Sequence, residues 1–295
     1  MSTKRLLIYP DSHIWDALYD QHVDPKSIID SLAARNATLV LSYHVVFEIA
    51  KIFMSLHAGR EARGIELFSY LKQFVDIGIP ETKQLSELLT AEAHALENDL
   101  SEIDPFASAE QSAIAKQEIA KLASGLIEGR VKEYIARRIK EAEETRDKQI
   151  AHLAARPKVK AILRARNKAE LDPWLRINAL SPLGAEMVCD RMEVMLGPGP
   201  TYDYALAVLL SSSGHIARGL VRADLYYNWR CAHGNSVPPD LMDDILHVLQ
   251  AIYCDAYITA ESDQAKYASL LLTSRTKIAI YDANLPIDQW LLSLF

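Results

Sequence analysis

The sequence predicts an α/β protein with a mainly parallel central sheet, interrupted by a large all-helical insertion. Two observations predict this class: short apolar strands alternate with helices over residues 1–80 and again over 240–295, whereas 81–239 holds no convincing strand pattern. Alternating strands and helices form parallel sheets, and right-handed crossovers place the helices on both faces. We therefore expect 1–80 and 240–295 to form one discontinuous α/β domain, with 81–239 as a helical insertion domain.

The first section opens with a strand, an acid and a helix. Lys4–Tyr9 is typical of a strand, Asp11 follows it, and Ser12–Gln21 has apolar residues at helical spacing. A helix, a second strand and two further helices are predicted next, at Pro25–Arg35, Ala37–Leu41, His44–Leu56 and Glu61–Phe74.

The middle of the chain is predicted to be helical. Breaks are expected at Pro157, at the GPGP sequence of 197–200 and at Asn235–Pro239, and a loop carrying Trp174 is expected over Asp172–Leu183. The predicted helices are Lys83–Asp99, Ser108–Ile150 (one long helix or a hairpin), Lys158–Lys168, Gly184–Leu196, Tyr202–Leu210 and His215–Trp229.

The α/β pattern returns near residue 240. Two strands alternate with three helices there: helix Asp240–Ala251, strand Tyr253–Thr259, helix Ser262–Leu272, strand Lys277–Tyr281 and helix Pro286–Leu294.

The composition indicates a globular protein of a reducing compartment. Nearly half of the 295 residues are apolar, and the three cysteines are scattered and odd in number, which argues against a disulfide framework. The apolar run near the start, RLLIY, is too short for a signal peptide or a membrane span. We expect a cytoplasmic protein that does not contact a membrane.

Charge is distributed unevenly along the chain. Arg130–Lys168 contains 13 Lys and Arg against 5 Asp and Glu, a net charge of +8, which leaves −15 on the rest of a chain whose total is −7. Such a segment can contact phosphates. It can equally be a solvated helix face with ion pairs along it, and the sequence favours this second interpretation slightly.

Acidic side chains collect at the predicted ends of strands and starts of helices. In an open α/β sheet, ligands bind outside the carboxyl ends of the strands, and oxygen ligands suit Mg²⁺ or Mn²⁺. Asp11 or Ser12 could instead only cap a helix, and Glu48 could only favour a helix dipole. The candidate metal ligands are Asp11, Glu48, Asp243, Asp244, Asp255, Glu261 and Asp263.

Several of these segments resemble the PIN-domain nucleases. YPDSHIWDAL resembles the family's first motif, LVLSYHVVFEIAKI the second, DDILHVLQAIYCDAYITAESD the third and fourth, and KIAIYD its last strand. The resemblance covers about 80 residues at the start and about 55 at the end. It implies a three-layer α/β/α fold, catalytic acids at Asp11, Glu48, Asp244 (or its neighbour Asp243) and Glu261, and the threonine of a Thr-x-Asp motif at Thr259.

Two positions depart from the family pattern. His13 stands where the first motif often has Asn, and Glu261 is one methylene longer than the Asp of the fourth motif. Other common sites have no counterpart, because the sequence contains no GxxxxGK[ST], GxGxxG or GxSxG motif.

The resemblance implies a metal-dependent endoribonuclease that uses Mg²⁺ or Mn²⁺ and acts on RNA rather than DNA. Asp11 and the Thr259–Glu261 region would bind the main cation, while Glu48 and Asp244 would complete the site or orient the water. The expected substrate contacts are Ser12, His13, Thr259, His247 (or His247 hydrogen-bonds an acid instead), Arg137, Arg138, Arg164 and Arg166.

The alternative is a non-catalytic PIN-like module. Its helical insertion would then form a surface for a protein partner or a second copy of the chain. The aromatic cluster of Tyr226, Tyr227 and Trp229 is expected to be helix packing rather than a platform for stacked bases, and His44 is expected to be a packing or surface residue.

Overall fold

A small parallel sheet joins the two ends of the chain. The computed structural model describes residues 5–55, 57, 59–197, 199–234, 237–273 and 275–295. The four strands are β1 (Leu6–Pro10), β2 (Ala37–Leu39), β3 (Ala256–Thr259) and β4 (Lys277–Ile280), in the order β2-β1-β3-β4. All three strand pairs are parallel, with Ile8 opposite Leu39 on one side and opposite Ala256 on the other. The predicted α/β architecture with a parallel sheet is confirmed, although helices make up most of the molecule.

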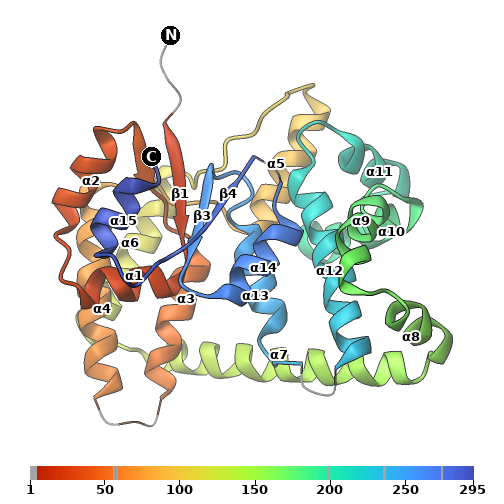
Figure 1. The fold of residues 1–295 in the computed structure, drawn as a ribbon, viewed down its shortest axis with the longest axis horizontal. Coiled ribbons are helices and arrows are strands. Elements are labelled where there is room, and N and C mark those ends of the chain that lie inside the picture. Colours follow the sequence, from red (N-terminus) through yellow and green to blue (C-terminus); the bar gives the residue numbers. More distant parts are fainter. Residues whose placement is uncertain (1–4, 56, 58, 198, 235–236, 274) are drawn as a thin grey trace.

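Helices from both ends of the chain pack around this sheet (Figure 1). Near β1 and β2 lie α1 (Ser12–Asp20), α2 (Pro25–Ala33) and α15 (Ile287–Ser293), while α14 (Ser262–Leu271) packs on β3 and β4. The first helix buries Ile14, Trp15 and Leu18, which recur on one of its faces. Trp15 meets the ring of Phe74 edge-on, with 5.0 Å between ring centroids.

Further helices complete this section and form the middle of the chain. They are α3 (Tyr43–Ala50), the 3-10 turn η1 (Lys51–Met54), α4 (Arg60–Ile77), α5 (Leu85–Glu97), α6 (Ala109–Ala123), α7 (Gly129–Ala154), α8 (Pro157–Arg164), α9 (Lys168–Asn178), α10 (Pro182–Leu196), α11 (Tyr202–Leu210), α12 (His215–His233) and α13 (Leu241–Leu249).

Two helices organise the middle of the chain. The long helix α7 runs along one side of the molecule, from the N-terminal helices to α12 (Figure 1). Helix α12 is buried on most of its surface and packs against α5, α7, α8, α9, α10, α11, α13 and α14. The buried apolar residues form one cluster that continues from the sheet into these helices, so both predicted parts share a single core.

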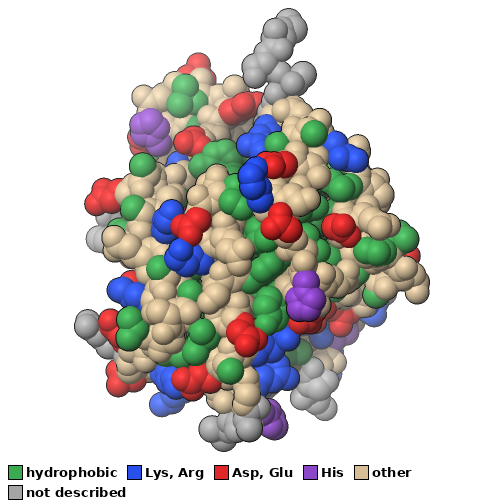
Figure 2. Space-filling model, turned by 90° about the vertical axis from the view of Figure 1, so that its left-hand side faces the viewer, with side chains coloured by type: hydrophobic (Ala, Val, Ile, Leu, Met, Phe, Trp, Pro, Cys, Tyr) green, Lys and Arg blue, Asp and Glu red, His purple; other side chains and the backbone are tan. Residues whose placement is uncertain are grey.

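The face at the left of Figure 1 carries both signs of charge. Figure 2 shows Lys and Arg side chains interspersed with Asp and Glu there. No helix among the described residues is long and apolar enough to cross a membrane.

Several predicted elements differ from the structure. The segment Ser108–Ile150 is divided between α6 and α7, and the helix expected over His44–Leu56 gives way to the 3-10 turn η1 after Ala50. The loop expected over Asp172–Leu183 is largely helix α9, which starts from its Asn167 cap and buries Leu171 and Leu175 despite an internal Pro173. The strand expected from Tyr253 begins only at Ala256, since the preceding residues form turns. Some ends of predicted segments, at Lys4, Leu56 and Asn235, lie outside the described residues.

Candidate functional site

The strand order reverses at β1, and we call the region at the carboxyl ends of β1 and β3 the β1–β3 crevice. From β1 the chain moves to β2 on one side, whereas β3 and β4 lie on the other side of β1. Open α/β sheets generally bind ligands at such a reversal of strand order, outside the carboxyl ends of the strands. Asp11 directly follows β1, and Thr259 ends β3.

Asp11 both caps a helix and contacts the neighbouring strand. One carboxylate oxygen accepts a hydrogen bond from the Ile14 amide at 3.0 Å, and the other accepts from the Thr259 hydroxyl. The Asp11 side chain is buried, with 2% exposure. Burial raises the pKa of Asp11 to about 6, although the Thr259 hydroxyl and the nearby His13 lower it. The sequence left open whether Asp11 caps a helix or belongs to the site. In the structure the same carboxylate caps α1 and contacts Thr259.

Glu261 and His13 lie at the rim of the same crevice. The Thr259 hydroxyl accepts a hydrogen bond from the Glu261 amide at 2.9 Å. The Glu261 carboxylate lies 2.9 Å from Nε2 of His13, and both side chains are about half exposed. Ser12, half-buried, is the first residue of α1. The two residues that depart from the family pattern thus contact each other.

Glu48 lies on α3 with two cationic or ionisable neighbours. Its Oε1 is 2.7 Å from the Lys51 Nζ and 3.4 Å from the His44 Nε2, although neither contact has hydrogen-bond geometry. Burial raises the pKa of Glu48, but His44 and Lys51 outweigh burial and bring it down to about 2. Glu48 therefore carries its charge at any physiological pH.

Helix α13 contributes two acids of different character. Asp243 is buried and 3.3 Å from Nη2 of Arg138 on α7. Burial raises its pKa, and Arg138 lowers it. The Asp244 side chain forms no hydrogen bond or ion pair with the described residues. Burial together with the Asp240, Glu48 and Glu261 carboxylates raises its pKa to about 7.

His247 is buried between α13, α3 and β1. Its ring lies 4.7 Å from the His44 ring and 5.5 Å from the Tyr9 ring, and its Nε2 has no hydrogen-bond partner in the described structure. Burial holds the pKa of His247 well below its usual value. At 3% exposure this ring is part of the packing beneath the acids.

Five of the predicted acids share one neighbourhood. The charge of Glu261 acts on both Asp11 and Asp244, and the charge of Glu48 acts on Asp244. Within the described ranges, however, no group of three or more His, Cys, Asp or Glu side chains converges closely enough to hold a metal ion. The charges link Asp11 with Glu261, and Glu48 with Asp243 and Asp244, while Glu261 also acts on Asp244.

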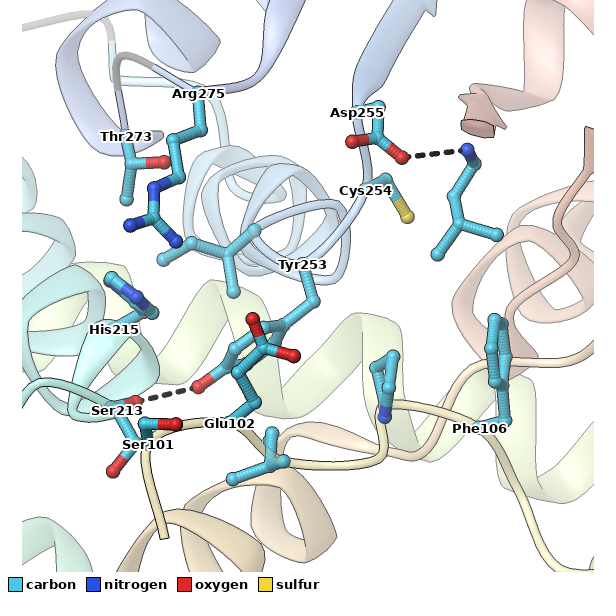
Figure 3. Close-up of a pocket in the computed structure, with 14 residues that line it drawn as sticks. Ser101, Glu102, Phe106, Ser213, His215, Tyr253, Cys254, Asp255, Thr273 and Arg275 are labelled. Carbon is cyan, nitrogen blue, oxygen red and sulfur yellow. Dashed lines mark hydrogen bonds between the residues drawn. The ribbon is translucent and has the colours of Figure 1, made fainter. Parts of the chain in front are cut away.

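Two other predicted acids have partners of their own. Asp255 precedes β3 at the amino end of the sheet, where its carboxylate accepts a hydrogen bond from the Leu7 amide at 2.8 Å (Figure 3). The expectation that it joins the acids is wrong because the strand begins after it. Asp263 is exposed on the first turn of α14, near Glu261, but its carboxylate pairs with Lys266 at 2.6 Å.

The predicted basic contacts divide into two places. Arg138 reaches Asp243, and Arg137 lies 3.8 Å from Glu141 with its guanidinium over the Tyr134 ring. Arg164 and Arg166 instead line a groove beside α12 and α14. The basic segment is thus not one continuous surface.

Sequence reasoning missed His44 and Lys51 as neighbours of the site. A signal was present, because both stand at helical i,i+4 or i,i+3 spacing from Glu48. No protein-family model, curated protein or solved structure matches the chain. The geometry of the crevice is therefore the basis for a functional assignment.

Proposed function

We propose that the protein is a metal-dependent endoribonuclease of PIN-like fold that acts on RNA, with Mg²⁺ or Mn²⁺ as its cofactor. The observation that supports this most is the hydrogen bond from Thr259 to Asp11 across the mouth of the β1–β3 crevice, with Glu261 beside it. It corresponds to the meeting of the first and fourth motifs that the resemblance implies.

The donor atoms are of the kind that a hard divalent cation prefers, although the described side chains would have to move together to hold one. Asp11, Glu261, Glu48 and Asp244 offer carboxylate oxygens, which such ions prefer. The raised pKa of Asp244 reflects burial and negative charge gathered around it, which a bound cation would relieve. A bound ion must compete with His13 for Glu261 and with Lys51 for Glu48.

The residues would divide the work by position. A divalent ion in such a site lowers the pKa of bound water and offsets charge on the leaving oxygen. Asp11 and Glu261 would hold the ion at the sheet edge, and Thr259 fixes the Asp11 carboxylate toward β3. Glu48 and Asp244 would complete the site or orient the attacking water, while Arg138 keeps α7 close to α13.

A non-catalytic module is the second candidate. It is favoured because no three of the described acids converge closely enough to hold a metal ion and because His13 and Lys51 already contact Glu261 and Glu48. The helical part also exposes apolar side chains suited to a protein partner, among them Ile177 at 70% and Val194 at 80%.

The deciding experiment measures metal binding and cleavage together. Ligand that binds only the native state raises the melting temperature, so Mn²⁺ should stabilise the wild-type protein, which should also cleave labelled RNA in Mg²⁺ or Mn²⁺ but not in EDTA. Asp11→Asn should lose both effects. The matched control is Asp24→Asn, because Asp24 caps α2 in the same way and lies outside the crevice. Wild-type protein without a Mn²⁺ shift or cleavage would establish the non-catalytic module instead.

A further inference from the structure

A second hollow lies beside the acids, where the α8–α9 junction meets α12 and α14. It is an open groove of about 790 Å³, within the size range of pockets that take a nucleotide-sized ligand. The side chains that give it its character are Arg164, Arg166, Lys168, Trp229, Arg230 and His233.

One carboxylate, Asp263, lies at the groove, where it pairs with Lys266 at 2.6 Å and is within electrostatic range of Arg230 and Lys168. The sequence contains no Asp or Glu over 148–169, and none of Arg164, Arg166 and Lys168 forms an ion pair with a described carboxylate. Nε of Arg164 donates to the Ala232 carbonyl at 2.6 Å, which fixes the guanidinium and leaves its other nitrogens for a ligand. The Arg230 guanidinium donates to the Tyr226 hydroxyl at 3.5 Å and forms no ion pair within the described ranges.

Helix α7 provides the contrast within the same basic segment. Each of its Lys and Arg side chains that the structure describes lies 2.8 to 3.8 Å from a carboxylate, including Glu61 and Asp243 from other helices. The positive charge of α7 is therefore locally neutralised. Excess positive charge is left on the stretch from 156 to 168, and three of its cations line the groove.

Aromatic rings form the floor of the groove. Tyr226 stacks on Trp229 with 6.0 Å between centroids and meets Tyr267 at 5.7 Å, and all three are nearly buried. His233 is exposed and packs on Trp229 at 4.4 Å. Its two ring nitrogens face the carbonyls of Trp229 and Arg164 at 2.9 and 3.2 Å, so the ring is held in place.

The groove adjoins the acidic site. Asp263, on its rim, is two residues after Glu261 along the first turn of α14. Tyr267 on the groove floor also lies within electrostatic range of Asp244. A chain bound in the groove could therefore continue toward the crevice.

We propose that this groove binds a single-stranded segment of RNA, with phosphates on Arg164, Arg166, Lys168 and Arg230 and a base against the exposed face of His233. Unpaired cations beside a fixed ring are the combination that binds single strands without sequence preference. The assignment rests on the proposed nuclease function, whose substrate it identifies as single-stranded next to the cleaved bond.

The test measures binding without cleavage. A fluorescein-labelled 12-nucleotide oligouridylate is titrated with full-length protein in EDTA, and anisotropy is followed over a range of salt concentrations. For Arg166→Glu with Lys168→Glu, we expect affinity to fall about tenfold or more at low salt and the salt slope to fall by about 1.4, which is roughly 0.7 for each lost contact. The control, Arg156→Glu with Lys158→Glu, changes charge equally outside the groove and should change affinity much less.

Two further measurements address the ring and the fold. His233→Ala should weaken binding with little change in the salt slope, because it removes a stacking face rather than a phosphate contact. In wild-type protein, 4-thiouridine in the oligonucleotide should crosslink to peptides that contain Trp229, His233 or Tyr267. This second readout needs no variant to fold.

The outcomes separate this inference from the nuclease proposal. Equal weakening by both double variants, equal affinity for a blunt RNA duplex, or crosslinks only outside the groove would each overturn the inference. If the protein binds the oligonucleotide as expected but shows no metal-dependent cleavage, RNA binding in the groove is supported. Only the nuclease assignment is then overturned.

Discussion

Asp11 shows how one side chain can be a helix cap and a candidate catalytic group. The sequence left these two alternatives open. In the structure the same carboxylate receives the Ile14 amide on one oxygen and the Thr259 hydroxyl on the other. The buried surroundings disfavour the charge of this carboxylate, so its ionised form lowers the stability of the fold.

Because the pKa of Asp11 is raised, we predict that replacing its carboxylate by a neutral group stabilises the fold, and that the gain depends on pH. A carboxyl whose folded pKa lies above its unfolded value stabilises the fold fully only below the unfolded value, and this contribution is lost as the pH rises through the folded value. For Asp11 the window runs from 3.8 to about 6, and the loss is at most about 3 kcal/mol. Asp11→Asn should therefore unfold at a higher temperature than wild type at pH 8 in EDTA.

The comparison at low pH completes this prediction. Near pH 4 the gain should largely disappear, because most of the wild-type carboxyl is then protonated in the folded protein. Asp24→Asn should change the melting temperature little at either pH, since Asn caps about as well as Asp. A lower melting temperature for Asp11→Asn at pH 8 would mean that the ionised carboxylate stabilises the fold.

Among the elements, most of those predicted from apolar spacing exist, and the failures have local causes. The predicted start of β3 was too early. The apolar sequence could not show that the Leu7 amide of β1 donates to the Asp255 side chain instead of to a strand carbonyl. Counting charges along the sequence could not show which Lys and Arg residues of 130–168 have acidic partners. Glu61 and Asp243, which pair with α7, come from distant parts of the chain. Such partners depend on tertiary contacts that a sequence pattern does not encode.

Thr259 couples the ends of β1 and β3, which leads to an element-level prediction. Thr259→Val keeps the shape of the side chain but removes the hydroxyl between Asp11 and the Glu261 amide. Leaving such buried groups unpaired should cost about 1–3 kcal/mol, measured by urea unfolding at pH 7. Any metal-dependent cleavage should fall as well. Thr259→Ser should restore much of both, whereas a valine variant as stable as wild type would show that the bridge contributes nothing.

At the scale of the whole molecule, the sequence correctly predicted that both ends of the chain build one sheet. Strand–helix alternation carried that information, because only 1–80 and 240–295 show it. The strand order and the position of the crevice could not be predicted from this alternation. Both depend on the side of β1 at which each later strand pairs. The sequence also did not predict that the two parts share one core. That core depends on the contacts of α12 with helices on all its sides.

The central position of β1 predicts that the N-terminal part will not fold without the C-terminal part. A chain ending at residue 239 leaves β1 paired only with β2, and the Asp11 amide loses its acceptor, the Ile258 carbonyl, at 3.0 Å. It also uncovers Tyr9, which is fully buried and packs against Tyr257 and His247. We expect residues 1–239 alone to show no cooperative thermal transition by circular dichroism. Co-expression with residues 240–295 should restore a transition whose midpoint rises with protein concentration, since association is then linked to folding. A cooperative transition of 1–239 alone would mean that the helical part supports the first strands without β3.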